Sequence, residues 1–166
     1  LPDLIPALHV RAPHMPLDLE ENLTLNLEAA LKSGGIDAAI IALPFAPPGV
    51  VAEFLYEEPF EVVVPVGHKW AKRKSIRPDE LAAEHPILLN VGHCFRDQVL
   101  EVCPELSRFS SSAEGIQKTF EGSSLDTIRH MVGSGLGFTV LPATSVPEKP
   151  SRDSLLEYIP FKPPAP

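Results

Sequence analysis

One pattern constrains the fold more than any other: a helix-forming segment, then glycines, then a short apolar segment. In residues 20–33 the apolar side chains recur at helical spacing, two glycines follow, and residues 37–43 are apolar without alternation. An apolar run bounded in this way is typical of a strand buried on both faces. Residues 123–134 and 138–141 repeat the pattern. Together they predict an α/β fold with a mainly parallel sheet.

The rest of the chain contains shorter elements, because 19 of its 166 residues are prolines and proline interrupts both helices and strands. A capping box that begins at Ser123 starts the helix over residues 123–134. A polar turn near residue 67 predicts two lobes, over residues 1–60 and 61–166. We further expect strands at residues 51–56, 60–66, 86–90 and 155–161, helices at 78–83 and 95–102, and a polar, mobile loop over 104–119.

Charge and composition exclude several classes of protein. The chain has 14 Lys and Arg against 22 Asp and Glu, a net charge of −8, so we do not expect it to bind nucleic acid by itself. Its longest apolar run is far shorter than the ~20 residues of a membrane span. The first residue is not Met, and we expect a fragment of a longer chain. Two cysteines do not form a secreted disulfide scaffold, which predicts a reducing, cytoplasmic setting.

The two cysteines are the candidate chemical groups. Cys94 follows a predicted strand and lies at the start of a predicted helix, where the positive end of the helix favours a thiolate. His93 and Arg96 are expected to add positive charge beside it. Cys103 lies nine residues further on. In one continuous helix the two Cα atoms would be about 13.5 Å apart, whereas a disulfide needs about 7 Å or less. A bond between them would therefore unwind the segment.

Other interpretations stay open at this point. A free cysteine is often only a small buried apolar residue. A zinc site is disfavoured because the chain has no paired C-x₂-C motif, and a thioredoxin-type motif is absent for the same reason. Thr24 by itself is typical of a hydroxyl on a helix surface, and Glu57 and Glu58 are expected to be solvated.

The string Gly92-His93-Cys94-Phe95-Arg96-Asp97-Gln98, with Cys103 after it, resembles the peroxide-sensing members of the LysR-type transcriptional regulators. The resemblance covers nearly the whole chain, including residues 33–43, 57–60, 68–71 and 124–147. The segments outside the cysteine string are shared by most LysR-type proteins, and the string itself is specific for the peroxide sensors. The loop over residues 104–120 is longer than in those regulators.

The resemblance implies a role for each matching residue. Cys94 is implied to react with peroxide and Cys103 to resolve the product to a disulfide. His93 and Asp97 are implied to organise the reduced pocket. Thr24 falls where the family has a threonine that helps to hold peroxide and its water. No metal and no cofactor is implied.

The implied fold is α/β, with two Rossmann-like lobes of the periplasmic-binding-protein type, the first of them incomplete in this chain. The implied function is sensing of hydrogen peroxide to control antioxidant genes, by stoichiometric signalling rather than enzyme turnover. The implied partners are hydrogen peroxide, further copies in a homodimer or tetramer, RNA polymerase in the full-length protein, and DNA through a domain outside this chain. No membrane partner is expected. Two alternatives remain: a LysR-type effector domain that binds a small organic anion between the lobes, and a thiol peroxidase.

Overall fold

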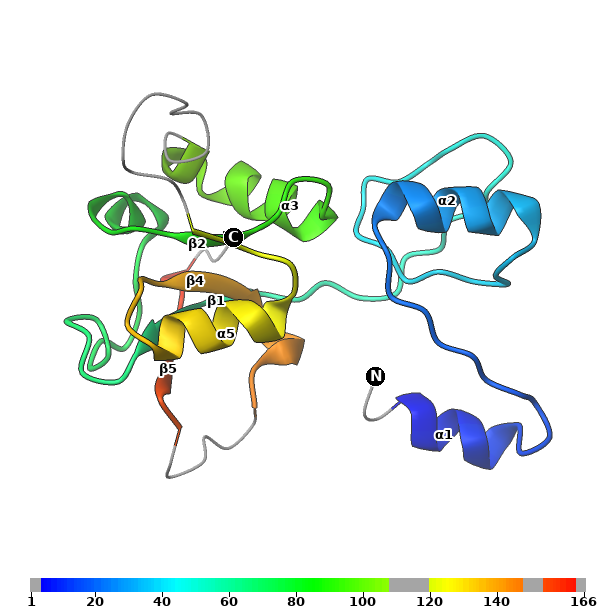
Figure 1. Ribbon diagram of the computed structural model, residues 1–166, viewed down its shortest axis with the longest axis horizontal. Coiled ribbons are helices and arrows are strands. Elements are labelled where there is room, and N and C mark those ends of the chain that lie inside the picture. The colour runs from blue at the N-terminus through cyan, green and yellow to red at the C-terminus, as the bar shows by residue number, and fades with distance from the viewer. Residues whose placement is uncertain (1–3, 108–119, 148–153, 164–166) are drawn as a thin grey trace.

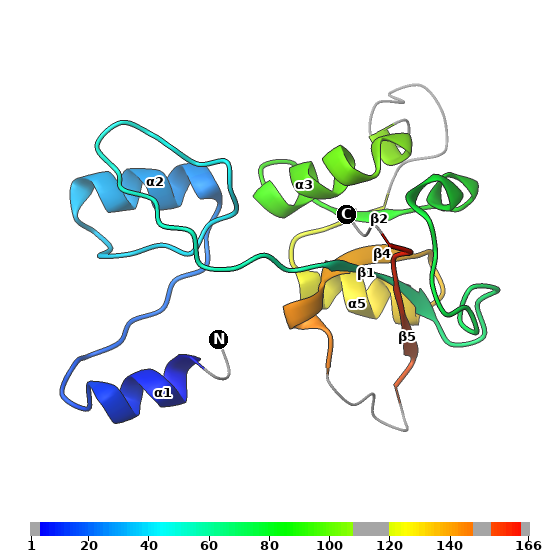
Figure 2. The same cartoon turned by 180° about the vertical axis from the view of Figure 1, so that it is seen from behind.

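The computed structural model describes residues 4–107, 120–147 and 154–163. In it the chain forms two parts that lie side by side and are joined by an extended segment (Figures 1 and 2). The N-terminal part contains α1 (Leu4–Arg11) and α2 (Thr24–Ser33), and the sheet part contains every strand of the described residues. The α/β class is confirmed, and the lobe boundary near residue 60 stays a prediction.

The sheet is mixed rather than mainly parallel. Its strands are β1 (Phe60–Pro65), β2 (Ile87–Leu89), β3 (Phe120–Gly122), β4 (Thr139–Pro142) and β5 (Leu156–Pro160). The central β1 pairs antiparallel with β4 on one side and β5 on the other, whereas β2 and β3 pair in parallel. The prediction of a mainly parallel sheet was wrong, because the order of elements along a sequence does not fix which strands become neighbours.

The two ladders join where β2 meets β4. Pro86 and Phe138 form a parallel bridge, and the Ile87 N–H donates to the Phe138 carbonyl at 2.7 Å. The hydroxyl of Thr139, which is buried, donates to the Ile87 carbonyl, also at 2.7 Å. A Cβ atom at Gly137 would lie 2.4 Å from the His85 carbonyl oxygen, so only glycine permits this approach.

Helices cover both faces of this sheet (Figure 1). They are the α-helices α3 (Cys94–Val102) and α5 (Leu125–Gly133) and the 3₁₀ helices η1 (Pro78–Ala83), η2 (Pro104–Leu106) and η3 (Ala143–Ser145). Side chains alternate along β1, as the period of a strand requires. Val63 packs with Ile128 and Val132 of α5, whereas Val62 and Val64 lie in the cluster that contains α3 residues and Cys103. The helix predicted at residues 95–102 is therefore confirmed and closes one face of the core.

The N-terminal part has no buried residue among residues 4–59. Residues 37–43 and 51–56 form neither a helix nor a strand and pair with no described segment, and Ile40 and Val51 are 60% and 87% exposed. The predictions of a buried strand at 37–43 and a strand at 51–56 were wrong. An apolar run becomes a strand only when a neighbouring strand satisfies its backbone groups, and the described residues supply none there.

Three helices differ in detail from their predictions. α2 begins at Thr24, not at residue 20, because the Asn22 side-chain oxygen accepts from the Leu23 N–H at 2.9 Å and favours a turn before the helix. Ser124, not Ser123, caps α5, and its hydroxyl accepts from the Thr127 N–H at 3.2 Å. The helix over residues 78–83 is a 3₁₀ helix. Most of the predicted loop at 104–119 lies outside the described residues, apart from η2 at its start and Ser107.

Candidate functional site

Cys94 is the first residue of α3 and is half-buried. A tight turn after β2 places it there: Gly92 has a φ of 101°, a left-handed conformation that favours glycine, and His93 is the extended residue before the helix. The first N–H groups of a helix have no partner within it, so they give the region around Cys94 a positive partial charge. The predicted position of Cys94 at a helix start is confirmed.

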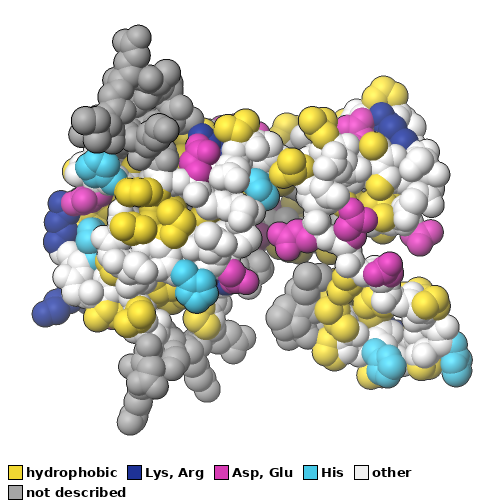
Figure 3. All heavy atoms as spheres, in the orientation of Figure 1, with side chains coloured by type: hydrophobic (Ala, Val, Ile, Leu, Met, Phe, Trp, Pro, Cys, Tyr) yellow, Lys and Arg dark blue, Asp and Glu magenta, His cyan; other side chains and the backbone are white. Residues whose placement is uncertain are grey.

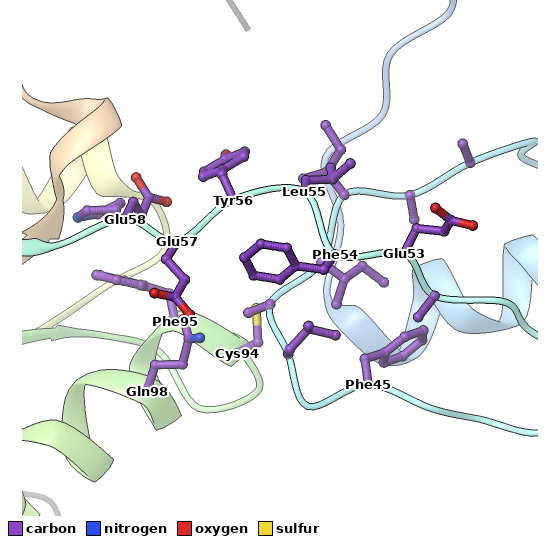
Figure 4. Close-up of a pocket in the computed structure, with 18 of the residues that line it drawn as sticks. Phe45, Glu53, Phe54, Leu55, Tyr56, Glu57, Glu58, Cys94, Phe95 and Gln98 are labelled. Carbon is purple, nitrogen blue, oxygen red and sulfur yellow. The ribbon is translucent and has the colours of Figure 1, made fainter. Parts of the chain in front are cut away.

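The Cys94 side chain lines an open groove of about 1340 Å³. α3 contributes Cys94, Phe95 and Gln98 to this groove, and most of its other lining residues belong to the segment over residues 37–60, together with Leu31, Leu125 and Pro142. In Figure 4 the sulfur of Cys94 points into the groove, below the ring of Phe54. A small solute can therefore reach the thiol from solvent between the two parts of the chain.

Cys103 has the opposite environment. It ends α3, with its N–H donating to the Val99 carbonyl at 3.0 Å, and its side chain is fully buried in the core. Burial, and secondarily the carboxylate of Glu105, raise the pKa of the Cys103 thiol to about 12. Cys103 is therefore held as an unreactive thiol while α3 is intact.

The two thiols are free and lie at opposite ends of one helix. Nine residues of rise separate their Cα atoms by about 13.5 Å along the axis, beyond the about 7 Å that a disulfide allows. A bond between them requires α3 to unwind.

Thr24 and His93, which were predicted to belong to the pocket of Cys94, are not among the residues that line the groove. Thr24 is the first residue of α2, and the N-terminal ends of α2 and α3 face each other (Figures 1 and 2). Leu23 connects them: its Cδ1 lies 3.5 Å from the position that a Cβ of Gly92 would occupy. His93 precedes Cys94 and is half-buried. Asp97 is exposed in the first turn of α3 and does not line the groove. The pocket roles of all three residues stay predictions.

The structure gives Arg96 a different role from the predicted one. Its side chain is only 4% exposed, donates to the Leu89 carbonyl, and forms an ion pair with Glu121 of β3 at 2.9 Å. A carboxylate thus offsets the charge that was expected to act on Cys94. Arg96 anchors α3 to the ends of β2 and β3 instead, which no sequence signal indicates because Glu121 is 25 residues away.

Sequence reasoning missed the groove residues beside Cys94. Gln98 could have been found, because it lies four residues after Cys94 and hence on the same face of α3. Phe54 and Glu57 carry no such signal, since they belong to an extended segment whose position depends on tertiary packing. Glu57 is exposed, as expected, whereas Glu58 is half-buried and accepts from the Thr144 N–H at 3.1 Å.

Two further searches cover only residues 4–107, 120–147 and 154–163. No group of three or more His, Cys, Asp and Glu side chains in these ranges could hold a metal ion. No helix within them is long and apolar enough to span a membrane.

Comparisons with known proteins agree on one family. The LysR substrate binding domain matches residues 1–166. A "Hydrogen peroxide-inducible genes activator" from Pectobacterium carotovorum is 37% identical over the whole chain, which spans 53% of that relative's length. The structure of a reduced form of OxyR from N. meningitidis is 48% identical, with a TM-score of 0.88 over 99% of this chain and 76% of that one. The reduced OxyR regulatory domain from Pseudomonas aeruginosa is 46% identical, with a TM-score of 0.85 and coverage of 99% and 76%. The chain therefore belongs to the LysR substrate-binding domain family and, within it, to the OxyR regulatory domains.

Proposed function

We propose that this chain is the hydrogen peroxide-sensing regulatory domain of a transcriptional regulator, with Cys94 as the reacting thiol and Cys103 as the resolving thiol. One observation carries the proposal: a single helix has an accessible cysteine at its N-terminal end and a fully buried cysteine at its C-terminal end. In this arrangement the accessible Cys94 reacts with the oxidant, and the buried Cys103 takes part only in the later step that forms the disulfide. The names of the relatives, including the OxyR "DNA-binding transcriptional dual regulator" of Escherichia coli, support the same function.

The chemistry proceeds in two steps. The Cys94 thiolate attacks one oxygen of hydrogen peroxide, the O–O bond breaks, and the leaving hydroxide takes a proton to become water. The sulfur is oxidised to a sulfenic acid, and the peroxide is reduced. In the second step the Cys103 sulfur attacks the sulfenic sulfur, and a second water leaves with the Cys103 proton. The product is a disulfide between Cys94 and Cys103.

The second step is the conformational signal. Cys103 cannot reach Cys94 while α3 is helical, so forming the bond breaks the hydrogen bonds of the helix. It also removes core contacts: Val99 is 2% exposed, and the ring of Phe95 packs edge-on against Phe60 with centroids 5.2 Å apart. Phe95 contacts both core clusters, one on each face of the sheet. Loss of α3 therefore removes side-chain contacts from both clusters of the core.

The remaining parts of the proposal concern the whole regulator. We propose that it acts in the cytoplasm as a homodimer or tetramer, contacts DNA through a domain outside this chain, and acts on RNA polymerase at the promoter. The net charge of −8 supports a separate DNA-binding domain, because this chain offers little attraction for a phosphate backbone.

A short pulse of peroxide tests the assignment of the two thiols. We expect Cys94 to be oxidised at least about tenfold faster than Cys103, because Cys94 is accessible and Cys103 is a buried thiol. Peptide mass mapping after alkylation measures both rates. In Cys103→Ser the reaction should stop at the sulfenic or a higher acid, without an intramolecular bond. Equal rates at the two sites in the native protein would remove the assignment.

A further inference from the structure

The groove that contains Cys94 is lined by charges of one sign. Its charged residues are Asp37, Glu53, Glu57 and Glu58, and none of the Lys, Arg and His residues that the structure describes lines it. Within the described ranges none of these four carboxylates takes part in a salt bridge. Glu58 accepts a backbone N–H, which leaves its negative charge in place. The lining therefore carries four negative charges that no described Lys, Arg or His neutralises in an ion pair.

The labelled carboxylates of the groove lie at different distances from the sulfur. In Figure 4 the carboxylate of Glu57 lies beside the Gln98 side chain, on the α3 side of the Cys94 sulfur, whereas the carboxylates of Glu58 and Glu53 lie at the two sides of the groove and point away from the sulfur. On the face shown in Figure 3, acidic side chains gather where the two parts of the chain meet, and the visible Lys and Arg side chains lie away from that junction. A solute that reaches Cys94 therefore lies beside the negative charge of Glu57 and within the same groove as the other carboxylates.

The apolar side chains of the groove strengthen the electric field of its carboxylates. Phe45, Phe54 and Phe95 line it together with the carboxylates. A cleft that combines charges of one sign with walls of low polarisability concentrates the electric field along its length. An anion that enters this groove is repelled by several charges at once, whereas an uncharged solute is not.

We propose that the groove selects oxidants by charge: Cys94 reacts readily with neutral oxidants such as hydrogen peroxide, and the four carboxylates disfavour anionic peroxides and anionic disulfides. Glu57, which lies beside the sulfur, is the main specificity-determining residue, and Glu53 acts from a greater distance. The substrate class rests on the proposed function, whereas the charge selectivity is a property of the groove that can be measured without peroxide.

Two alkylating reagents of similar size but different charge test the proposal on the full reduced chain. Iodoacetamide is neutral and iodoacetate is anionic, and peptide mass mapping reports the rate of each at Cys94. The ratio of the iodoacetate rate to the iodoacetamide rate is normalised to the same ratio in urea-unfolded chain. At low salt we expect the normalised ratio to be about three- to tenfold below one, and high salt should bring it close to one, because salt screens charge repulsion.

Variants identify the source of the selectivity. Glu57→Gln and Glu53→Gln should each raise the low-salt ratio, and the double variant should raise it further. Glu101→Gln is the matched control, because it removes one exposed carboxylate from α3, the helix that begins at Cys94, at a position outside the groove. A normalised ratio of one at low salt would overturn the proposal, as would an equal effect of Glu101→Gln or a Cys94 that neither reagent reaches. Slow oxidation of Cys94 by hydrogen peroxide would instead refute the proposed function and leave the measured charge selectivity unaffected.

Discussion

At the scale of single residues, the two cysteines differ because of where α3 begins and ends. Cys94 occupies a helix start that a glycine turn exposes to a groove, and Cys103 occupies a helix end inside the core. The same helix thus makes one sulfur accessible and keeps the other protonated. This difference in environment, rather than the presence of two cysteines, permits ordered chemistry.

The substitution Thr24→Val tests whether the start of α2 belongs to the reactive site. Valine keeps the shape of threonine but removes a hydroxyl that could bind peroxide or its water. Because the N-terminal end of α2 faces the end of α3 that begins at Cys94, we expect slower oxidation of Cys94 by up to about tenfold, since one hydrogen bond contributes about 0.5–1.5 kcal/mol. Stopped-flow kinetics measure the rate, and circular dichroism checks the fold. An unchanged rate would return Thr24 to an ordinary helix residue.

The raised pKa of Cys103 predicts a dependence of stability on pH. The folded pKa is about 12 against an ordinary value of 9.0, so the folded state favours the protonated thiol. The stabilisation is complete below about pH 9 and is lost as the pH rises from 9 towards 12, because the unfolded chain ionises first. Between about pH 8 and about pH 10.5, the reduced protein should lose about 1–2 kcal/mol relative to Cys103→Ala. Urea unfolding of both proteins measures this difference, and parallel pH profiles would contradict it.

At the scale of elements, a turn, core packing and a side-chain anchor hold α3 in place. The Gly92 turn sets its start, Phe95 and Val99 pack into the core, and Arg96 fixes it to β2 and β3. Each contact belongs to the helical state, so each opposes the unwinding that the disulfide demands. The stability of α3 therefore sets how readily the sulfenic acid at Cys94 is resolved.

Glu121→Gln tests the anchor formed by Arg96. The substitution leaves a buried guanidinium without its carboxylate, and we expect a loss of about 1–2 kcal/mol of unfolding free energy, since Glu121 itself is partly solvated. Asp79→Asn is the control, because its ion pair with Arg77 is more than half exposed on both sides and should contribute less than about 1 kcal/mol. Urea unfolding of the reduced proteins measures both. Equal losses would mean that the Arg96 contact is not an anchor.

A strand was predicted correctly from the sequence where its backbone pairs with a neighbouring strand in the fold. The strands at residues 60–66, 138–141 and 155–161 were predictable, because their apolar side chains pack on both faces of one sheet. Residues 37–43 have an equally apolar pattern, yet none of them is buried and none pairs in a ladder in the described structure. An apolar composition shows that a segment can be buried. Whether it forms a strand depends on neighbouring strands that lie elsewhere in the chain.

At the scale of the whole molecule, the reactive site lies where the two parts meet. Cys94 and its helix could be predicted from local sequence, because glycine, histidine, cysteine and the helix pattern are contiguous. The groove could not be predicted, because most of its other lining residues lie between residues 37 and 60 and come close to Cys94 only in the folded chain. The contact between Leu23 and Gly92 likewise joins segments that are far apart in the sequence. A change in α3 therefore acts on the junction of the two parts as well as on the core.

The most direct test of the central claim, that peroxide unwinds α3, is hydrogen exchange over residues 92–104 in the reduced protein and in protein oxidised by peroxide. The reduced chain should protect the amides of α3, from the second turn of the helix to Cys103. After the disulfide between Cys94 and Cys103 forms, we expect that protection to be lost, while the amides of β1 and β5 remain protected. Equal protection of α3 in both states, in protein whose disulfide is verified by mass, would contradict the account and make the bond a local crosslink without a conformational signal.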